Sequence, residues 1–180
     1  LLLFCGVRVG NAVTKSVTQE VDPFIGTAYV GHTYPCATTP FGMVQVGPDN
    51  RFGHGDWTFC SGYNDASTYI EGFSHTHLSG TGCPDLGDIM VMTVRPCTGN
   101  VSLTEKEGKA YGSEFSHTTE KASPGYYAVT LSDYGIRAEM TATPRAGFHK
   151  YTYPANAQSG IMIDIGHGVS ANVKESFTKV

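Results

Sequence analysis

Apolar and polar residues alternate most clearly in the second half of the chain. From Ile136 to Ala142 every second residue is apolar, so these side chains share one face of an extended strand. Residues 127–131 alternate in the same way, and the polar and glycine-containing run 132–135 separates the two stretches. The pattern predicts a β-hairpin over residues 127–142.

Further short apolar stretches predict more strands, at residues 43–46, 89–95, 148–153 and 161–165. We expect the last of them, with three isoleucines in five positions, to be buried. No segment has a convincing helical period. Short strands separated by turn residues predict an all-β fold, an antiparallel β-sandwich. The stretch 47–87, rich in Gly, Asp, Ser and Thr, is expected to be an irregular loop that carries function.

Composition narrows the class of protein. The 180 residues include 12 Lys and Arg against 16 Asp and Glu, which gives a net charge of −4, so an electrostatic role with nucleic acid is not expected. With 40% hydrophobic residues the chain is not of the disordered type. It has no run of about 18 apolar residues, so no membrane-spanning segment is predicted.

The two ends suggest a piece of a larger exported protein. Residues 1–7 are apolar and resemble the end of a secretory signal peptide, so we assign 1–19 to a signal remnant and leader and 20–180 to one partial β-sandwich domain. Only a short polar tail follows the predicted strand 161–165, and we therefore expect the domain to be incomplete at its C-terminus. A secreted, periplasmic or cell-envelope location follows from this interpretation.

Four cysteines remain when Cys5 is assigned to the leader. Cys36, Cys60, Cys83 and Cys97 allow three disulfide pairings, and buried free thiols are an equally open alternative. None of them forms a C-x-x-C motif, so a structural zinc site is not expected.

Trp57 is the first candidate for a functional residue. It is the only tryptophan, and an exposed indole offers a flat apolar face on which a sugar ring can stack. A tryptophan that anchors a loop or fills the core is the alternative interpretation, and the sequence leaves both open.

His75 and His77 form the second candidate. On an extended strand they would point the same way and could share a metal ion or a substrate hydroxyl group. A catalytic zinc ion needs a third ligand, which His54, Asp85 or Asp88 would have to supply. A histidine that orients a loop through hydrogen bonds is the alternative.

Asp85 and Asp88 form the third candidate. Glycoside hydrolysis uses two carboxyl groups roughly 5–9.5 Å apart, and residues three positions apart can reach that separation. However, aspartates beside Pro84 and Gly87 ahead of a predicted strand are also typical of turns, and we favour the turn.

Several motifs occur together in one order, and this order resembles the N-terminal domain of glycoside hydrolase family 92, the calcium-dependent exo-α-mannosidases. The motifs are VDPFIGT (residues 21–27), GHTYP (31–35), TPFGMVQ (39–45), CSGY (60–63), GFSHTHLSGTG (72–82), KASPGYY (121–127) and GFHKY (147–151). They extend over residues 20–168.

The resemblance implies a two-domain enzyme in which an N-terminal β-sandwich packs on a C-terminal (α/α)₆ barrel, with the active site between them. In that family the general acid, the general base and most calcium ligands come from the barrel, and no segment here resembles it. We therefore expect no catalytic residue and no metal ligand in this chain. The implied reaction is inverting hydrolysis of terminal α-mannose from N-glycans or mannans, so a mannose-containing glycan and the barrel domain are the expected partners and calcium the expected cofactor.

By the same resemblance, this domain supplies one wall of the sugar pocket. Trp57 corresponds to a tryptophan that packs on the mannose, and Ser74, His75, His77 and Thr81 are expected near the terminal mannose. A free-standing carbohydrate-binding module and a metal hydrolase that uses His75, His77 and an aspartate are the two competing hypotheses.

Overall fold

The computed structural model describes residues 16–50, 57–80, 82–94, 111–155, 157 and 160–169. Short 3₁₀ turns are η1 (Val17–Glu20), η2 (Trp57–Phe59) and η3 (His117–Thr119). The strands are β1 (Ala37–Thr38), β2 (Gln45–Asp49), β3 (Tyr69–Ile70), β4 (Gly72–Ser74), β5 (Met90–Val94), β6 (Ser113–Glu114), β7 (Lys121–Ser123), β8 (Tyr126–Leu131), β9 (Ile136–Ala142), β10 (Gly147–Thr152) and β11 (Gly160–Asp164).

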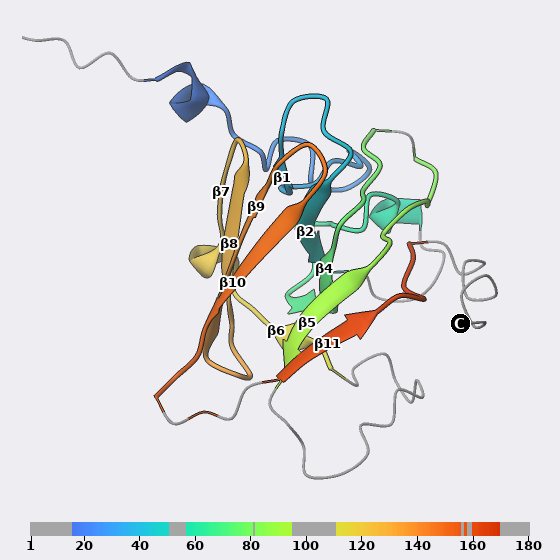
Figure 1. Cartoon of the computed structure of the whole chain (residues 1–180). Helices are drawn as coiled ribbons and strands as arrows, with labels where there is room; N and C mark the ends of the chain where they lie inside the picture. Colours follow the sequence, from blue (N-terminus) through green and yellow to red (C-terminus); the bar gives the residue numbers. More distant parts are fainter. Residues whose placement is uncertain are drawn as a thin grey trace, which may run out of the picture.

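The strands form two main sheets that pack against each other (Figure 1). One sheet has five strands in the order β1-β2-β4-β5-β11, and the other has four in the order β10-β9-β8-β7. A small pair, β3 and β6, completes the described part. Every strand pairing in these sheets is antiparallel, so the predicted all-β fold, an antiparallel β-sandwich, is confirmed.

The hairpin predicted from the alternating pattern is present as β8 and β9. Leu131 pairs with Ile136 and Tyr126 with Thr141, so the register runs through the whole hairpin. The turn between the strands contains Gly135 at φ +65°, a left-handed conformation that glycine adopts without a steric cost. On β9, Ile136, Ala138 and Met140 are buried and the residues between them are less so, as the alternation predicts.

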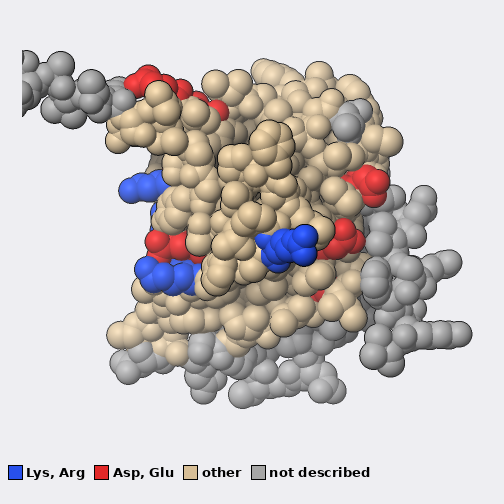
Figure 2. Space-filling view, turned by 45° about the horizontal axis from the view of Figure 1, so that its top comes forward, with Lys and Arg blue, Asp and Glu red and all other residues tan. Residues whose placement is uncertain are grey.

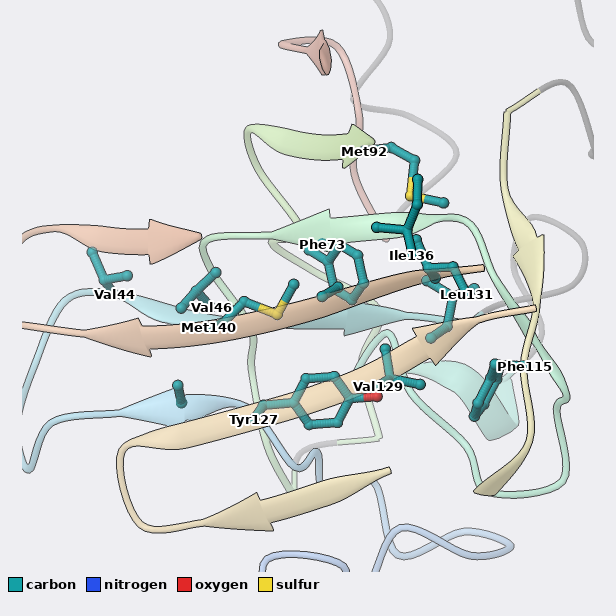
Figure 3. Close-up of a cluster of buried hydrophobic side chains, with 13 residues drawn as sticks. Val44, Val46, Phe73, Met92, Phe115, Tyr127, Val129, Leu131, Ile136 and Met140 are labelled. Atoms are coloured by element: carbon teal, nitrogen blue, oxygen red, sulfur yellow. The ribbon is translucent and has the colours of Figure 1, made fainter. Parts of the chain in front are cut away.

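The hydrophobic core lies between the two sheets (Figure 3). The five-stranded sheet contributes Val46, Phe73 and Met92, and the ring of Phe73 lies 6.4 Å from that of Tyr151 on β10. From the other sheet come Tyr127, Val129, Leu131, Ile136, Ala138 and Met140. Full burial of each large side chain of this kind stabilises the fold by about 1.5–3 kcal/mol.

Two expectations about the first half of the chain are wrong in detail. The strand predicted at 43–46 is β2, which begins at Gln45, because the amide of Met43 donates instead to the carbonyl oxygen of Pro144 at 2.8 Å, in the β9–β10 turn. The stretch expected to be irregular, 47–87, contains β3 and β4. These strands have two and three residues, which is too short to produce a visible alternation.

The strand expected to be buried at 161–165 is β11, and that expectation is also wrong. β11 lies at the edge of the five-stranded sheet and pairs with β5. Met162 packs against the core, but the side chains of Ile161, Ile163 and Ile165 are all more than half exposed. Side chains alternate between the two faces of a strand, so Met162 points to the core while Ile161 and Ile163 point to the opposite, exposed face.

The described residues include no helix long and apolar enough to cross a membrane. One face of the molecule, reached by turning the top of Figure 1 forward, is mostly uncharged, with few Lys, Arg, Asp and Glu side chains (Figure 2).

Candidate functional site

Trp57 begins the short turn η2 and is 54% exposed, so the interpretation of this residue as a core tryptophan is wrong. Its carbonyl oxygen accepts a hydrogen bond from Sγ of Cys60 at 2.9 Å, which fixes the turn. The indole ring meets the ring of His32 edge to face, with the centroids 4.5 Å apart and the planes at 90°. An exposed indole that is held at its edge by a buried ring is a rigid platform for a flat apolar ligand surface.

His32 and Gly82 form the support of this platform. His32 lies in the loop before β1 and is buried, and its carbonyl oxygen accepts the amide of Gly80 at 2.6 Å. A Cβ atom at Gly82 would lie 3.2 Å from both the His32 ring and Nε1 of Trp57, so this contact has little room for a larger residue. Nothing in the sequence set His32 apart, because it was only one residue of the GHTYP motif.

His77 and Ser74 are both buried, and their side chains are directed into the domain. Nδ1 of His77 donates to the carbonyl oxygen of Gln45 at 2.8 Å, and its Nε2 donates to Oδ1 of Asp49 at 3.0 Å. Oγ of Ser74 lies 3.3 Å from the same Nε2. Neither side chain is therefore open to a ligand in this structure, and both hold the segment that follows β4.

The contacts of His77 make it a buried cation. Burial opposes its charge, but Cys36 and Asp49 raise the pKa of His77 well above its ordinary value. Burial alone would raise the pKa of Asp49, yet His77 and His167 together lower it well below its usual range. Nε2 of His167 lies 3.2 Å from Oδ2 of Asp49, so the carboxylate sits between two histidines. Neither Asp49 nor His167 could be found from the sequence, because the chain brings them together from distant positions.

His75 is partly exposed and makes a different set of contacts. Its Nδ1 lies 2.7 Å from the carbonyl oxygen of Ile89, and its Nε2 lies 3.1 Å from Nε2 of His149 on β10. Nδ1 of His149 lies 3.0 Å from the hydroxyl group of Tyr151. Burial and the neighbouring His75 lower the pKa of His149 to about 4.

These distances determine the proton positions when both rings are neutral. A carbonyl oxygen only accepts, so Nδ1 of His75 carries its proton and its Nε2 accepts one from His149. Nδ1 of His149 then accepts from the hydroxyl group of Tyr151. The chain of hydrogen bonds joins the residue that follows β4 to β10, and thus connects the two sheets.

The metal hypothesis for His75 and His77 is not supported by this geometry. β4 ends at Ser74, so the two histidines do not alternate on a strand, and each is bonded to a different group. In the ranges that the structure describes, no three His, Cys, Asp or Glu side chains lie close enough to hold a metal ion.

Asp85 and Asp88 make the contacts of turn residues. Oδ1 of Asp85 accepts the amide of Leu86, and the carboxylate of Asp88 accepts the hydroxyl group of Thr76 at 2.8 Å. The amide of Asp88 donates back to the same hydroxyl group. These contacts support the turn interpretation that the sequence favoured.

Some of the remaining residues named from the sequence, the cysteines among them, are described by the structure, and others are not. Cys36 and Cys60 are buried and Cys83 is exposed, and no disulfide joins any two of these three described cysteines. Thr81, a predicted sugar contact, lies outside the described residues, as do His54 and Cys97.

Comparisons with known proteins point to one family. The family model described as glycosyl hydrolase family 92 N-terminal domain matches residues 20–180. An uncharacterized secreted glycosidase of Arthroderma benhamiae is 32% identical over 166 residues, which are 86% of this chain and 20% of that protein.

Solved structures agree with this match. A family GH92 α-mannosidase from Bacteroides thetaiotaomicron, in complex with mannoimidazole, is 42% identical, with a TM-score of 0.76 over 87% of this chain and 20% of that chain. The GH92 family glycosyl hydrolase ccman5 is 29% identical, with a TM-score of 0.71 over 86% of this chain and 21% of that one. The chain thus spans about a fifth of the length of these relatives.

Proposed function

Because this chain belongs to glycosyl hydrolase family 92, whose N-terminal domain it matches, we propose that it is the sugar-contacting domain of a secreted exo-acting α-mannosidase. The whole protein would remove terminal α-mannose from N-glycans or mannans with inversion. We place the catalytic carboxylates and most calcium ligands in a partner (α/α)₆ barrel outside these 180 residues. The relatives support this proposal, since one is a secreted glycosidase and another an α-mannosidase solved with mannoimidazole.

The observation that carries the proposal is the exposed indole of Trp57 on its buried support. Stacking of an aromatic ring on the C–H face of a sugar needs an apolar surface that is both accessible and fixed. Trp57 has both properties, because it is more than half exposed and its edge rests on His32.

The other predicted residues take supporting roles in this proposal. His75 is partly exposed and stays a proposed sugar contact, and Thr81 stays a prediction as well. Ser74 and His77 are buried, so we propose that they act by holding the loop that follows β4. In this arrangement the domain positions the sugar and excludes water, which lowers the barrier through geometry rather than through proton transfer.

The proposal is tested by comparing this chain with the full-length protein that contains it, using α-1,2-, α-1,3- and α-1,6-linked mannobiose. The full-length protein should release mannose, initially as the β-anomer, because inverting hydrolysis exchanges the configuration. The isolated chain should release none. Turnover by the isolated chain would defeat the assignment of catalysis to another domain.

Calorimetric titration of the isolated chain with the same disaccharides separates the proposal from a free-standing binding module. We expect no strong affinity, because half of the cleft is absent. Tight binding together with an inactive full-length protein would favour the module.

A further inference from the structure

The support of Trp57 contains a nitrogen atom that has no partner. His32 is 6% exposed, and within the part of the chain that the structure describes its Nε2 is enclosed and makes no hydrogen bond. A buried polar atom without a partner destabilises a fold, because it has lost its hydrogen bonds to water and gained none in return. This ring nitrogen lies beside the proposed sugar platform, so a hydrogen bond to a ligand would satisfy it.

The backbone of His32 is also strained. Its φ angle is +53°, in the left-handed region that non-glycine residues rarely adopt. The conformation is held by the bond from the Gly80 amide to the His32 carbonyl oxygen and, next to it, by the bond from the Thr33 amide to that of Gly26 at 3.3 Å. Such conformations persist where the surrounding structure enforces them, and they concentrate at functional sites.

The ring of His32 has little free space around it. The missing side chain of Gly82 leaves the space in which the His32 ring and the Trp57 indole meet. Gly82 itself has φ +62°, so a larger residue would be opposed by both sterics and backbone conformation. Strain, close approach and an unsatisfied atom thus coincide at one side chain, and each is an independent observation.

We propose that His32 is a second sugar-binding residue beside Trp57, and that its Nε2 forms a hydrogen bond with a hydroxyl group of the mannoside that stacks on the indole. This inference rests on the proposed function and adds a residue to it. An imidazole nitrogen can donate to or accept from a hydroxyl group, and a sugar hydroxyl group offers both possibilities. Since Nε2 is covered in the sugar-free chain, the contact requires a small local rearrangement around the His32 ring.

The competing explanation is that His32 only fills space under Trp57. The substitution His32→Phe separates the two, because it keeps an aromatic ring and removes both ring nitrogens. In either case the loss of an unsatisfied buried nitrogen favours the variant, while the larger ring at φ +53° opposes it, so the melting temperature should change little. Only a sugar-binding role predicts that a protein of nearly unchanged stability hydrolyses its substrate less well.

The experiment uses the full-length protein with the mannobiose that it hydrolyses fastest. We expect His32→Phe to lower kcat/KM at least tenfold, mostly through KM, while the melting temperature changes little. His32→Asn should keep more activity than His32→Phe, because asparagine tolerates the left-handed conformation and carries an amide group that can bond a hydroxyl group. His117→Phe, on the distant turn η3, is the matched control and should leave kcat/KM unchanged.

The outcomes are distinguishable. Hydrolysis by His32→Phe at the unaltered rate would overturn the inference and leave the proposed function intact. Absence of hydrolysis by the unaltered full-length protein would defeat the proposed function and this inference with it. If His32→Phe does not fold, His32→Asn and His32→Ala decide instead. A wild-type KM in both of these folded variants would contradict a bond between His32 and the sugar.

Discussion

Asp49 illustrates how a single side chain can determine the state of its neighbours. Both ring nitrogens of His77 face acceptors, the carbonyl oxygen of Gln45 and the carboxylate of Asp49, so the imidazole is held as a cation inside the domain. The side chains of this pair are essentially inaccessible to solvent. Removing one partner of a buried pair leaves the other charge uncompensated, which costs about 3–5 kcal/mol.

Asp49→Asn should therefore lower the free energy of unfolding of the isolated chain by about 3 kcal/mol, measured by urea denaturation at pH 6. Asp85→Asn is the control, since Asp85 is exposed and bonded to its neighbour Leu86, and its change should stay within about 0.5 kcal/mol. Equal small losses in both variants would mean that the buried pair does not stabilise the fold.

The pH dependence of that difference follows from the two pKa shifts. The pKa of Asp49 is lowered in the folded chain, so its contribution is present above its ordinary value of about 3.9 and is lost as the pH falls. The pKa of His77 is raised, so its contribution is complete below its ordinary value of about 6.5 and declines as the pH rises. The stability difference between wild type and Asp49→Asn should be largest between about pH 4 and 6.5, and a difference that grows outside this window would contradict the assignment.

Trp57 gives a prediction of the opposite kind, a loss of function without a loss of stability. Trp57→Ala should reduce kcat/KM of the full-length protein at least tenfold, because the stacking surface is removed. The indole is more than half exposed, so the melting temperature should fall little. Phe148→Ala, a similarly exposed aromatic residue on β10, should keep its activity, and equal losses in both variants would argue against a specific role for Trp57.

Individual elements differ in how far the sequence could predict them. The β8–β9 hairpin was predictable because one face of it is buried, so its alternation is regular over many residues. β2 was displaced by the bond from Met43 to Pro144, which joins residues far apart in the chain and leaves no local pattern. The composition of β11 indicated burial, whereas the exposure of its isoleucines depends on the face of the sheet to which they point.

The link between β4 and β10 should respond to acid. The folded chain lowers the pKa of His149 to about 4, below the ordinary value of about 6.5, so the unfolded chain binds more protons between these values. Stability must then fall as the pH decreases from about 6.5 to 4, by up to about 3 kcal/mol.

His149→Phe should abolish this part of the acid sensitivity, which urea denaturation at several pH values will measure. His117→Phe removes an exposed histidine instead and serves as the control. An unchanged slope of stability against pH in His149→Phe would show that the pair does not titrate as described.

For the molecule as a whole, the exposed isoleucines of β11 favour self-association. An apolar strand at a sheet edge has free backbone groups and can pair with another chain. The isolated chain should self-associate at high concentration, and Ile163→Lys should reduce this without lowering the melting temperature, because Ile163 is 61% exposed. Sedimentation velocity provides the measurement, with Met162→Lys as the contrasting variant, which should destabilise the core. A strictly monomeric wild-type chain would contradict this prediction.

The sequence also predicted the candidate site only in part. The sequence singled out Trp57 as its only tryptophan, and the motif GFSHTHLSGTG singled out the segment around His75 and His77. They could not reveal that His32 lies under Trp57, that His149 bonds His75, or that His77 faces inward. Each of these facts depends on contacts between residues remote in the chain, and periodicity carries no information about them.

The position of His167 has a consequence for biosynthesis. Asp49 and His77 leave the ribosome early, but the second histidine on the carboxylate is near the end of the described chain and is translated much later. Until it arrives, the anion has only one of its two neighbours, and the nascent domain cannot complete this buried cluster. This buried cluster is thus completed only after nearly all of these residues have been made.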